Sequence, residues 1–133
     1  MINQLAVFLE NRKGRIGDCC KVLRDAGINL SSMSIADTTD FGILRLMTND
    51  NDKAFEVLKR SGFMCAMVSL VAMRVPDRPG ALADILIALD EAGVNIEYLY
   101  SFASDNGSAH IGFKTNDADK AASLLVNLGV EVL

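Results

Sequence analysis

The sequence is poor in the residues that mark several protein classes. Its 133 residues include three cysteines, two prolines, one histidine and no tryptophan. Cys19 and Cys20 are adjacent and Cys65 is alone, which fits neither a disulfide framework nor the ligand spacing of a zinc site. We therefore expect three buried or half-buried thiols. No apolar run approaches the roughly 20 residues that span a bilayer, and residues 1–4 lack the basic start of a signal peptide, so the expected location is cytoplasmic.

Charge and chemistry-bearing residues are also scarce. Against 17 Asp and Glu stand 13 Lys and Arg, a net charge of -4, with no basic cluster to neutralise phosphates, so nucleic acid is not an expected partner. The single histidine, His110, falls inside an expected strand, where a structural role is the simpler interpretation. No glycine-rich phosphate loop or metal-ligand spacing occurs, so we expect no enzyme activity, no cofactor and no metal. Cys19 and Cys20 follow the first turn of an expected helix, whose dipole would lower a thiol pKa somewhat, but no cationic partner is evident.

What the sequence does contain is an internal repeat. With a shift of 66, residues 5–16 match residues 71–82, and the Asp-Ala-Gly-Ile-Asn of 25–29 matches the Glu-Ala-Gly-Val-Asn of 91–95. With a shift of 67, residues 48–54 match 115–121 at every position but one. Such ordered matches between chemically diverse residues predict a tandem repeat of two domains, at 1–68 and 69–133.

Each copy shows the pattern strand, helix, strand, strand, helix, strand. In the first copy the strands are expected at 5–9, 30–36, 42–48 and 63–68, with a helix after Gly14 and another after Asp50, which can cap it. Gly27 and Gly93 are placed where helices commonly stop. This order predicts an α+β protein of two ferredoxin-like βαββαβ units, each a four-stranded antiparallel sheet with two helices on one face.

The hairpins and the open sheet face add two expectations. Residues 105–107, Asp-Asn-Gly, suit a tight hairpin turn, whereas the first hairpin has a longer tip at 38–41. Ile96, Tyr98, Tyr100 and Phe102 are expected to share one strand face. Because a sheet that is apolar on both faces needs cover, we expect a homodimer or a closely packed pair of sheets.

The turns between the first strand and first helix of each copy are the best candidate binding site. A helix N-terminus presents unpaired N–H groups and partial positive charge, and Gly14 or Gly80 would let a carboxylate approach that backbone closely. Asn29 and Asn95, at the start of the next strand, offer a carbonyl to an ammonium and an amide to a carboxylate. These groups suit a zwitterion. The alternative is that both glycines only permit tight turns and that both asparagines only end helices.

At these positions the chain resembles the ACT domain, a regulatory module that binds amino acids and controls metabolic enzymes. The resemblance covers nearly the whole chain and is closest at 77–82, Asp-Arg-Pro-Gly-Ala-Leu, followed by 92–96, Ala-Gly-Val-Asn-Ile. The first copy departs from the family at Lys13, where proline is common, and at Arg15, where a small residue is usual. Residues 34–45 and 97–102 are similar to stand-alone tandem ACT proteins, which have no attached catalytic domain.

The resemblance implies that two units pack side by side with an extended antiparallel sheet and bind effectors at their interface. One pocket would join residues 11–16 with 95–98, and the other would join 77–82 with 29–32. The pockets would differ in charge, because residues 1–66 carry nine basic and eight acidic side chains and residues 67–133 carry four and nine. The expected ligand-binding residues are Asn11, Arg12, Gly14, Arg15, Ile16, Asn29, Leu30, Asp77, Arg78, Pro79, Gly80, Ala81, Leu82, Asn95 and Ile96. Among them Asp77 could hold an ammonium, and Arg12 or Arg15 a carboxylate.

The functional hypothesis is a non-catalytic, allosteric regulator that binds a free amino acid and acts on a metabolic enzyme as partner. A first alternative is a protein-interaction module that docks on a biosynthetic enzyme and binds no small molecule. A second is a ferredoxin-like enzyme such as an acylphosphatase, for which Arg12, Arg15 and Asn29 could imitate the catalytic residues. The required glycine-rich phosphate cradle is missing, which disfavours the enzyme.

Overall fold

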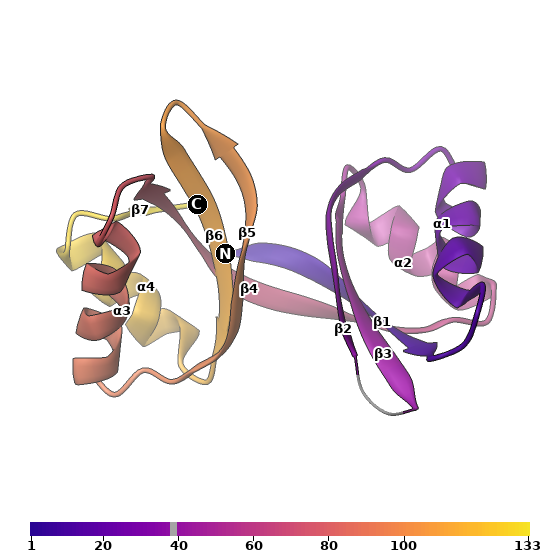
Figure 1. Ribbon diagram of the computed structural model, residues 1–133, viewed down its shortest axis with the longest axis horizontal. Helices are drawn as coiled ribbons and strands as arrows, with labels where there is room; N and C mark the ends of the chain where they lie inside the picture. The colour runs from indigo at the N-terminus through magenta and orange to yellow at the C-terminus, as the bar shows by residue number, and fades with distance from the viewer. Residues whose placement is uncertain (38–39) are drawn as a thin grey trace. The chain divides into compact units, whose positions relative to one another are not determined.

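The computed structural model describes residues 1–37 and 40–133 and divides the chain into two compact units (Figure 1). The N-terminal unit comprises Asn3–Val68. The C-terminal unit comprises Ser69–Leu133 together with Met1–Ile2. Each unit has its own hydrophobic core, so each is described by itself.

The N-terminal unit has the predicted element order. Its elements are β1 (Ile2–Glu10), α1 (Arg15–Asp25), β2 (Leu30–Asp37), β3 (Phe41–Thr48), α2 (Asn51–Arg60) and the first part of β4 (Met64–Pro76). The strand order is β2-β3-β1-β4, with β3 antiparallel to both β2 and β1. Figure 1 shows α1 and α2 on the same side of this sheet. Of the longer hairpin tip predicted at 38–41, residues 38 and 39 lie outside the described residues, and β3 begins at Phe41.

The C-terminal unit repeats this arrangement. It contains the rest of β4, α3 (Ala81–Glu91), β5 (Ile96–Asp105), β6 (Ser108–Thr115), α4 (Ala118–Asn127) and β7 (Glu131–Val132). Its strands are ordered β5-β6-β4-β7 and are antiparallel, and α3 and α4 lie together on one side of the sheet (Figure 1). The prediction of an α+β protein with two ferredoxin-like βαββαβ units is confirmed.

The cores follow from strand alternation and helix amphipathicity. In the C-terminal unit, Val71, Met73 and Val75 of β4 point to one face and pack with Ile85 and Leu89 of α3. Alternate residues of a strand point to opposite faces, so Arg74 lies on the face away from the helices. The N-terminal unit repeats the pattern with its own strands and helices.

A single strand joins the two units. The last strand of the first copy was expected to end at residue 68, at the domain boundary, but β4 runs without interruption for 13 residues across that boundary. No glycine or proline interrupts it before Pro76, and its centre, from Leu70 to Met73, is buried. A run of apolar residues without a turn-forming residue favours a continuous buried strand.

The prediction that Ile96, Tyr98, Tyr100 and Phe102 share one face of β5 is wrong for Ile96. Ile96 packs on the helix-side core, whereas Phe102 lies on the other face, beside Gly112. The register with β6 shifts between Ile96 and Tyr98 and again between Ser101 and Ala103. Each bulge adds a residue and reverses the alternation, so the four residues cannot share one face. The tight turn at the end of this hairpin is confirmed, with positive φ at Asn106 (44°) and Gly107 (76°).

Candidate functional site

The helices of each unit begin in two different ways. Asp50 caps α2 by accepting a hydrogen bond from the backbone N–H of Lys53, and Asp117 caps α4 in the same way from Lys120, both at 3.1 Å. Within residues 1–37 and 40–133, no side chain caps α1 or α3. The first-turn N–H groups of an α-helix have no intrahelical acceptor. In α1 and α3 the first of these groups donates to a turn carbonyl, Arg15 to Arg12 at 3.4 Å and Ala81 to Arg78 at 3.3 Å, which leaves the N–H groups of the next two residues of each helix available to an anion.

Glycine at the N-cap of α1 and α3 makes this uncapped start possible. Gly14 has φ 89° and Gly80 has φ 87°, a left-handed conformation that costs a residue with a Cβ about 1–2 kcal/mol. A Cβ built at either glycine meets no atom within 4 Å. Open space therefore adjoins the backbone at both turns, and a ligand could approach it.

At the first turn the structure brings several predicted residues together. Asn11, Arg12 and Ile16 line a hollow of about 230 Å³, completed by Ile35 of β2 and neighbouring residues of β1 and β3. The Nε of Arg12 donates to Glu10 at 2.8 Å, and both side chains are more than half exposed. This hollow is mainly apolar, with one neutralised guanidinium at its rim.

Arg15, which was also predicted to bind the ligand, does not line this hollow. Its guanidinium carbon is 4.6 Å from the centre of the Phe63 ring, and one of its terminal nitrogens is 3.4 Å from Asp18. The side chain is only 19% exposed. The arginine thus packs within its own unit, a placement that sequence reasoning missed because Phe63 is 48 residues away.

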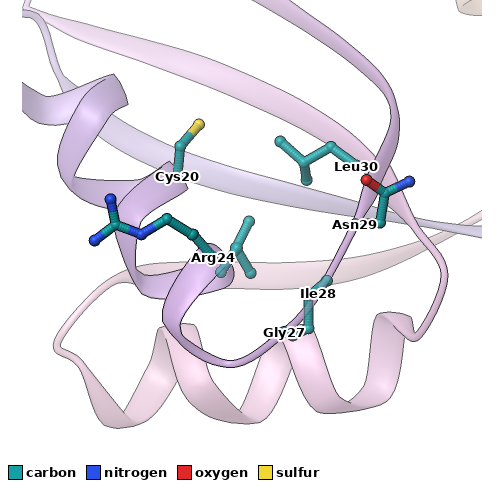
Figure 2. Close-up of a pocket in the computed structure, with 7 residues that line it drawn as sticks. Cys20, Arg24, Gly27, Ile28, Asn29 and Leu30 are labelled. Atoms are coloured by element: carbon teal, nitrogen blue, oxygen red, sulfur yellow. The ribbon is translucent and has the colours of Figure 1, made fainter.

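Asn29 and Leu30 line a second hollow, of about 410 Å³, at the other end of α1 (Figure 2). Cys20 and Arg24 of α1 form its other wall. The backbone N–H of Asn29 donates to the Asn49 side chain at 3.0 Å, and its carbonyl accepts from the Asn49 N–H at 3.1 Å. Asn49 therefore fixes the backbone of Asn29. The N-terminal unit does not bring Asn29 and the turn at 11–16 into one hollow.

In the C-terminal unit, Arg78 and Ala81 line a hollow of about 380 Å³, which we call the C-terminal hollow. Further residues line it that the sequence did not single out, among them Arg74, Asp84, Ser108 and Glu131. The available signal was the alanine at 81 where the first copy has Arg15.

The remaining predicted residues of this unit divide between turn and core. Leu82 and Ile96 are half-buried and pack on the core beneath α3 and α4. Asp77, Pro79 and Gly80 form the exposed turn, and Asn95 follows the helix end at Gly93, whose φ is 79°. The Asp77 N–H donates to the Gly107 carbonyl at 2.8 Å, which holds the turn against the β5–β6 hairpin.

A charged cluster lies on the sheet face away from the helices. Asp105 accepts from Arg74 and lies 3.2 Å from the His110 Nε2, while Glu131 lies 2.9 Å from the Arg74 Nε. Partial desolvation would raise the pKa of Asp105, but the His110 hydrogen bond and the Arg74 cation together lower it below its ordinary value. Phe102 packs edge-on against His110, with ring centres 5.9 Å apart. The histidine thus has a structural environment.

The cysteines are free thiols, with Cys19 buried and Cys20 and Cys65 half-buried, as expected. The expected lowering of a thiol pKa by the helix dipole is wrong for Cys19. Burial raises its pKa to about 12, and the opposing effect of Arg15 is smaller. Burial also raises the pKa of Cys65. Neither thiol is an activated nucleophile.

In the described part of the chain, no group of three or more His, Cys, Asp or Glu side chains is placed to hold a metal ion. Among the same residues, none of the helices combines the length and the apolar character needed to cross a membrane.

A family model described as "ACT domain pair" matches residues 1–132. The solved structure of protein BT0572 from Bacteroides thetaiotaomicron is 41% identical, with a TM-score of 0.91, and the match covers 98% of this chain and 90% of that one. The regulatory subunit of aspartate kinase from Thermus thermophilus is 14% identical, with a TM-score of 0.66 and coverage of 94% and 91%. No curated protein matches the sequence.

The family match and the 41% identical structure each extend over nearly the whole chain. The aspartate kinase subunit, at lower identity, shares the fold. The predicted resemblance is thereby confirmed, and the chain belongs to the family of ACT domain pairs.

Proposed function

We propose that this protein is a non-catalytic regulator of amino-acid metabolism that binds a free amino acid at the interface of its two ACT domains, residues 1–68 and 69–133. The observation that carries the proposal is the contrast between helix starts. α2 and α4 are capped by Asp50 and Asp117, whereas α1 and α3 start at left-handed glycines with open space beside them.

The chemistry of the two turns suits the two charges of an amino acid. The first-turn N–H groups of α1 or α3 bind the carboxylate, and Gly14 or Gly80 admits it to the backbone. The side chain of Asn29 or Asn95 accepts from the ammonium, and Asp77 adds a negative charge near the second turn. In this proposal one pocket joins residues 11–16 with 95–98, and the other joins residues 77–82 with 29–32.

Regulation requires that the ligand prefer one arrangement of the protein. An effector that contacts both domains stabilises the arrangement in which both contacts are made, and it shifts the population by its differential affinity. The regulatory subunit of aspartate kinase, which shares the fold, supports a regulatory role of this class. We further propose that the protein acts as a homodimer in the cytoplasm and controls a metabolic enzyme as its partner.

The expected affinity is modest. A ligand of about ten heavy atoms, at roughly -0.3 to -1.5 kcal/mol per atom, reaches micromolar dissociation constants but seldom tighter ones. Such an affinity suits a sensor of metabolite concentration.

Thermal unfolding in the presence of each common amino acid at millimolar concentration tests the proposal. At a hundredfold excess over Kd, binding stabilises the protein by about 2.7 kcal/mol and raises Tm by several degrees. Asn95→Ala is expected to reduce the rise, because it removes an acceptor for the ammonium. Asn127→Ala, at the end of α4, is the matched control and is expected to leave it unchanged.

Exposed apolar side chains favour a second candidate function, that of a protein-interaction module. Several large apolar side chains of the N-terminal unit are exposed, among them Phe41 (54%), Met33 (49%) and Ile35 (49%). An exposed apolar surface favours a protein-interaction module that docks on a biosynthetic enzyme without a small ligand. If no amino acid changes Tm, this second candidate replaces the first.

A further inference from the structure

The C-terminal hollow lies entirely within the C-terminal unit. It is formed by the end of β4, the first turns of α3, the start of β6 and the segment between α4 and β7, and its volume is about 380 Å³. Pockets that bind small molecules commonly have about 300–1,000 Å³. The hollow is therefore large enough for a free amino acid.

Its walls carry both signs of charge. Arg74 and Glu131 contribute to the lining, but the Arg74 guanidinium is not available to a ligand, because on the sheet face away from the helices it binds Asp105 and lies 2.9 Å from Glu131. Arg78 and Asp84 are exposed, and neither has a side-chain partner among the residues whose structure is described. One guanidinium and one carboxylate are thus available to a ligand that itself carries both charges.

The same place in the N-terminal unit is filled by the chain itself. Asp84 and Asp18 are equivalent, since each donates its N–H to the N-cap glycine carbonyl, at 3.0 and 2.9 Å. Val130 and Phe63 are equivalent, since each donates to a leucine carbonyl of the preceding helix, at 2.9 and 3.0 Å. Between Asp18 and Phe63 lies the guanidinium of Arg15.

The second copy retains the acidic residue and lacks the arginine. Ala81 stands at the position equivalent to Arg15, and Val130 replaces the phenylalanine that Arg15 covers. The space occupied by a guanidinium in one unit is therefore the hollow of the other, and Asp84 still faces it.

We propose that the C-terminal hollow is a second ligand site, which binds a free amino acid with a guanidinium side chain. The guanidinium takes the place that Arg15 occupies in the other unit and pairs with Asp84. The carboxylate of the ligand pairs with Arg78, and the Ser108 hydroxyl offers a further hydrogen bond. The site is built from one unit and does not depend on the proposed effector site at the domain interface.

Isothermal titration calorimetry of the full chain with arginine tests the proposal. Saturable binding is expected, and Asp84→Asn is expected to weaken it by about two- to fivefold, because an ion pair with an exposed carboxylate is lost. Asp119→Asn makes the same charge change on α4, outside the hollow, and should have no effect. Absence of saturable binding at millimolar arginine, or equal binding by the Asp84→Asn and Asp119→Asn variants, would overturn the proposal.

A further variant separates this site from the interface site. Asn95→Ala alters the proposed interface site but no residue of the hollow, so arginine affinity is expected to stay unchanged. A loss of arginine binding in Asn95→Ala, with none in Asp84→Asn, would assign arginine to the interface and overturn the second site.

The reciprocal experiment uses the N-terminal unit. Arg15→Ala is expected to open an equivalent hollow beside Asp18 and to lower Tm, and added arginine should restore part of that loss. Glycine and sodium chloride at the same concentration serve as controls for the zwitterion and for ionic strength. If arginine and glycine raise the Tm of Arg15→Ala equally, the space left by the Arg15 side chain does not select a guanidinium. That result would overturn the proposal, which rests on the equivalence of this space and the C-terminal hollow.

Discussion

A negative charge placed in the first turn of α3 should compete with the effector carboxylate. Ala83 is exposed, and because α3 begins at Ala81 it occupies the third helical position. A glutamate there interacts favourably with the uncapped N-terminus and can reach back to the N-cap N–H. Ala83→Gln is the matched control, because it has the same shape without the charge.

The expected magnitudes follow from the missing cap. A carboxylate at an exposed helix N-terminus contributes about 0.3–1 kcal/mol, which raises Tm by about 1–8 °C in a unit of this size. Ala83→Glu should therefore have a higher Tm than Ala83→Gln in the absence of effector. The same free energy opposes the effector carboxylate, so the Kd should rise about two- to fivefold.

The assay is differential scanning calorimetry of both variants, with and without the amino acid that stabilises the wild-type protein, followed by titration calorimetry. The decisive comparison is between the Glu and Gln variants. If the glutamate stabilises α3 but both variants bind the effector with the same Kd, the effector carboxylate does not occupy this helix N-terminus, and the reasoning is refuted.

Three further predictions concern the stability and reactivity of single residues. Asp50→Ala and Asp117→Ala each remove a helix cap and should cost about 1 kcal/mol in chemical denaturation, additively in the double variant; strong non-additivity would contradict independent caps. Cys19, with a pKa of about 12, should resist thiol reagents at pH 8 until the protein unfolds, and rapid native-state labelling, mapped by mass spectrometry, would contradict its burial. Because the folded pKa of Asp105 is lowered, its contribution to stability is complete above the unfolded pKa and is lost as the pH falls through the folded pKa. The fall in Tm between pH 5 and pH 2 should therefore be smaller in Asp105→Asn than in wild type, and identical profiles would show that the cluster does not contribute.

Local features of the fold could be read from the sequence because their causes are local. The cap predicted at Asp50 is formed, and Asp117, its equivalent in the repeat, caps α4 in the same way. Gly27 and Gly93 predict helix ends, and both have positive φ. The internal repeat then allowed each local prediction to be made twice.

Features that depend on distant residues could not be predicted in the same way. The bulges in β5 depend on its pairing with β6, so alternation along β5 alone placed Ile96 on the wrong face. The packing of Arg15 on Phe63 joins two ends of one unit. The C-terminal hollow arises from an alanine at 81 and a valine at 130, which are 49 residues apart and individually unremarkable.

The central claim is that uncapped helix N-termini bind the effector carboxylate. Two-dimensional ¹H–¹⁵N NMR of the labelled protein, titrated with the amino acid that stabilises it, tests this claim at each N–H group. The largest shift changes are expected in the first turns of α1 and α3, between Gly14 and Gly17 and between Gly80 and Ala83, with small changes at the capped starts of α2 and α4. Changes centred on other residues, with both glycine turns unaffected, would contradict the account.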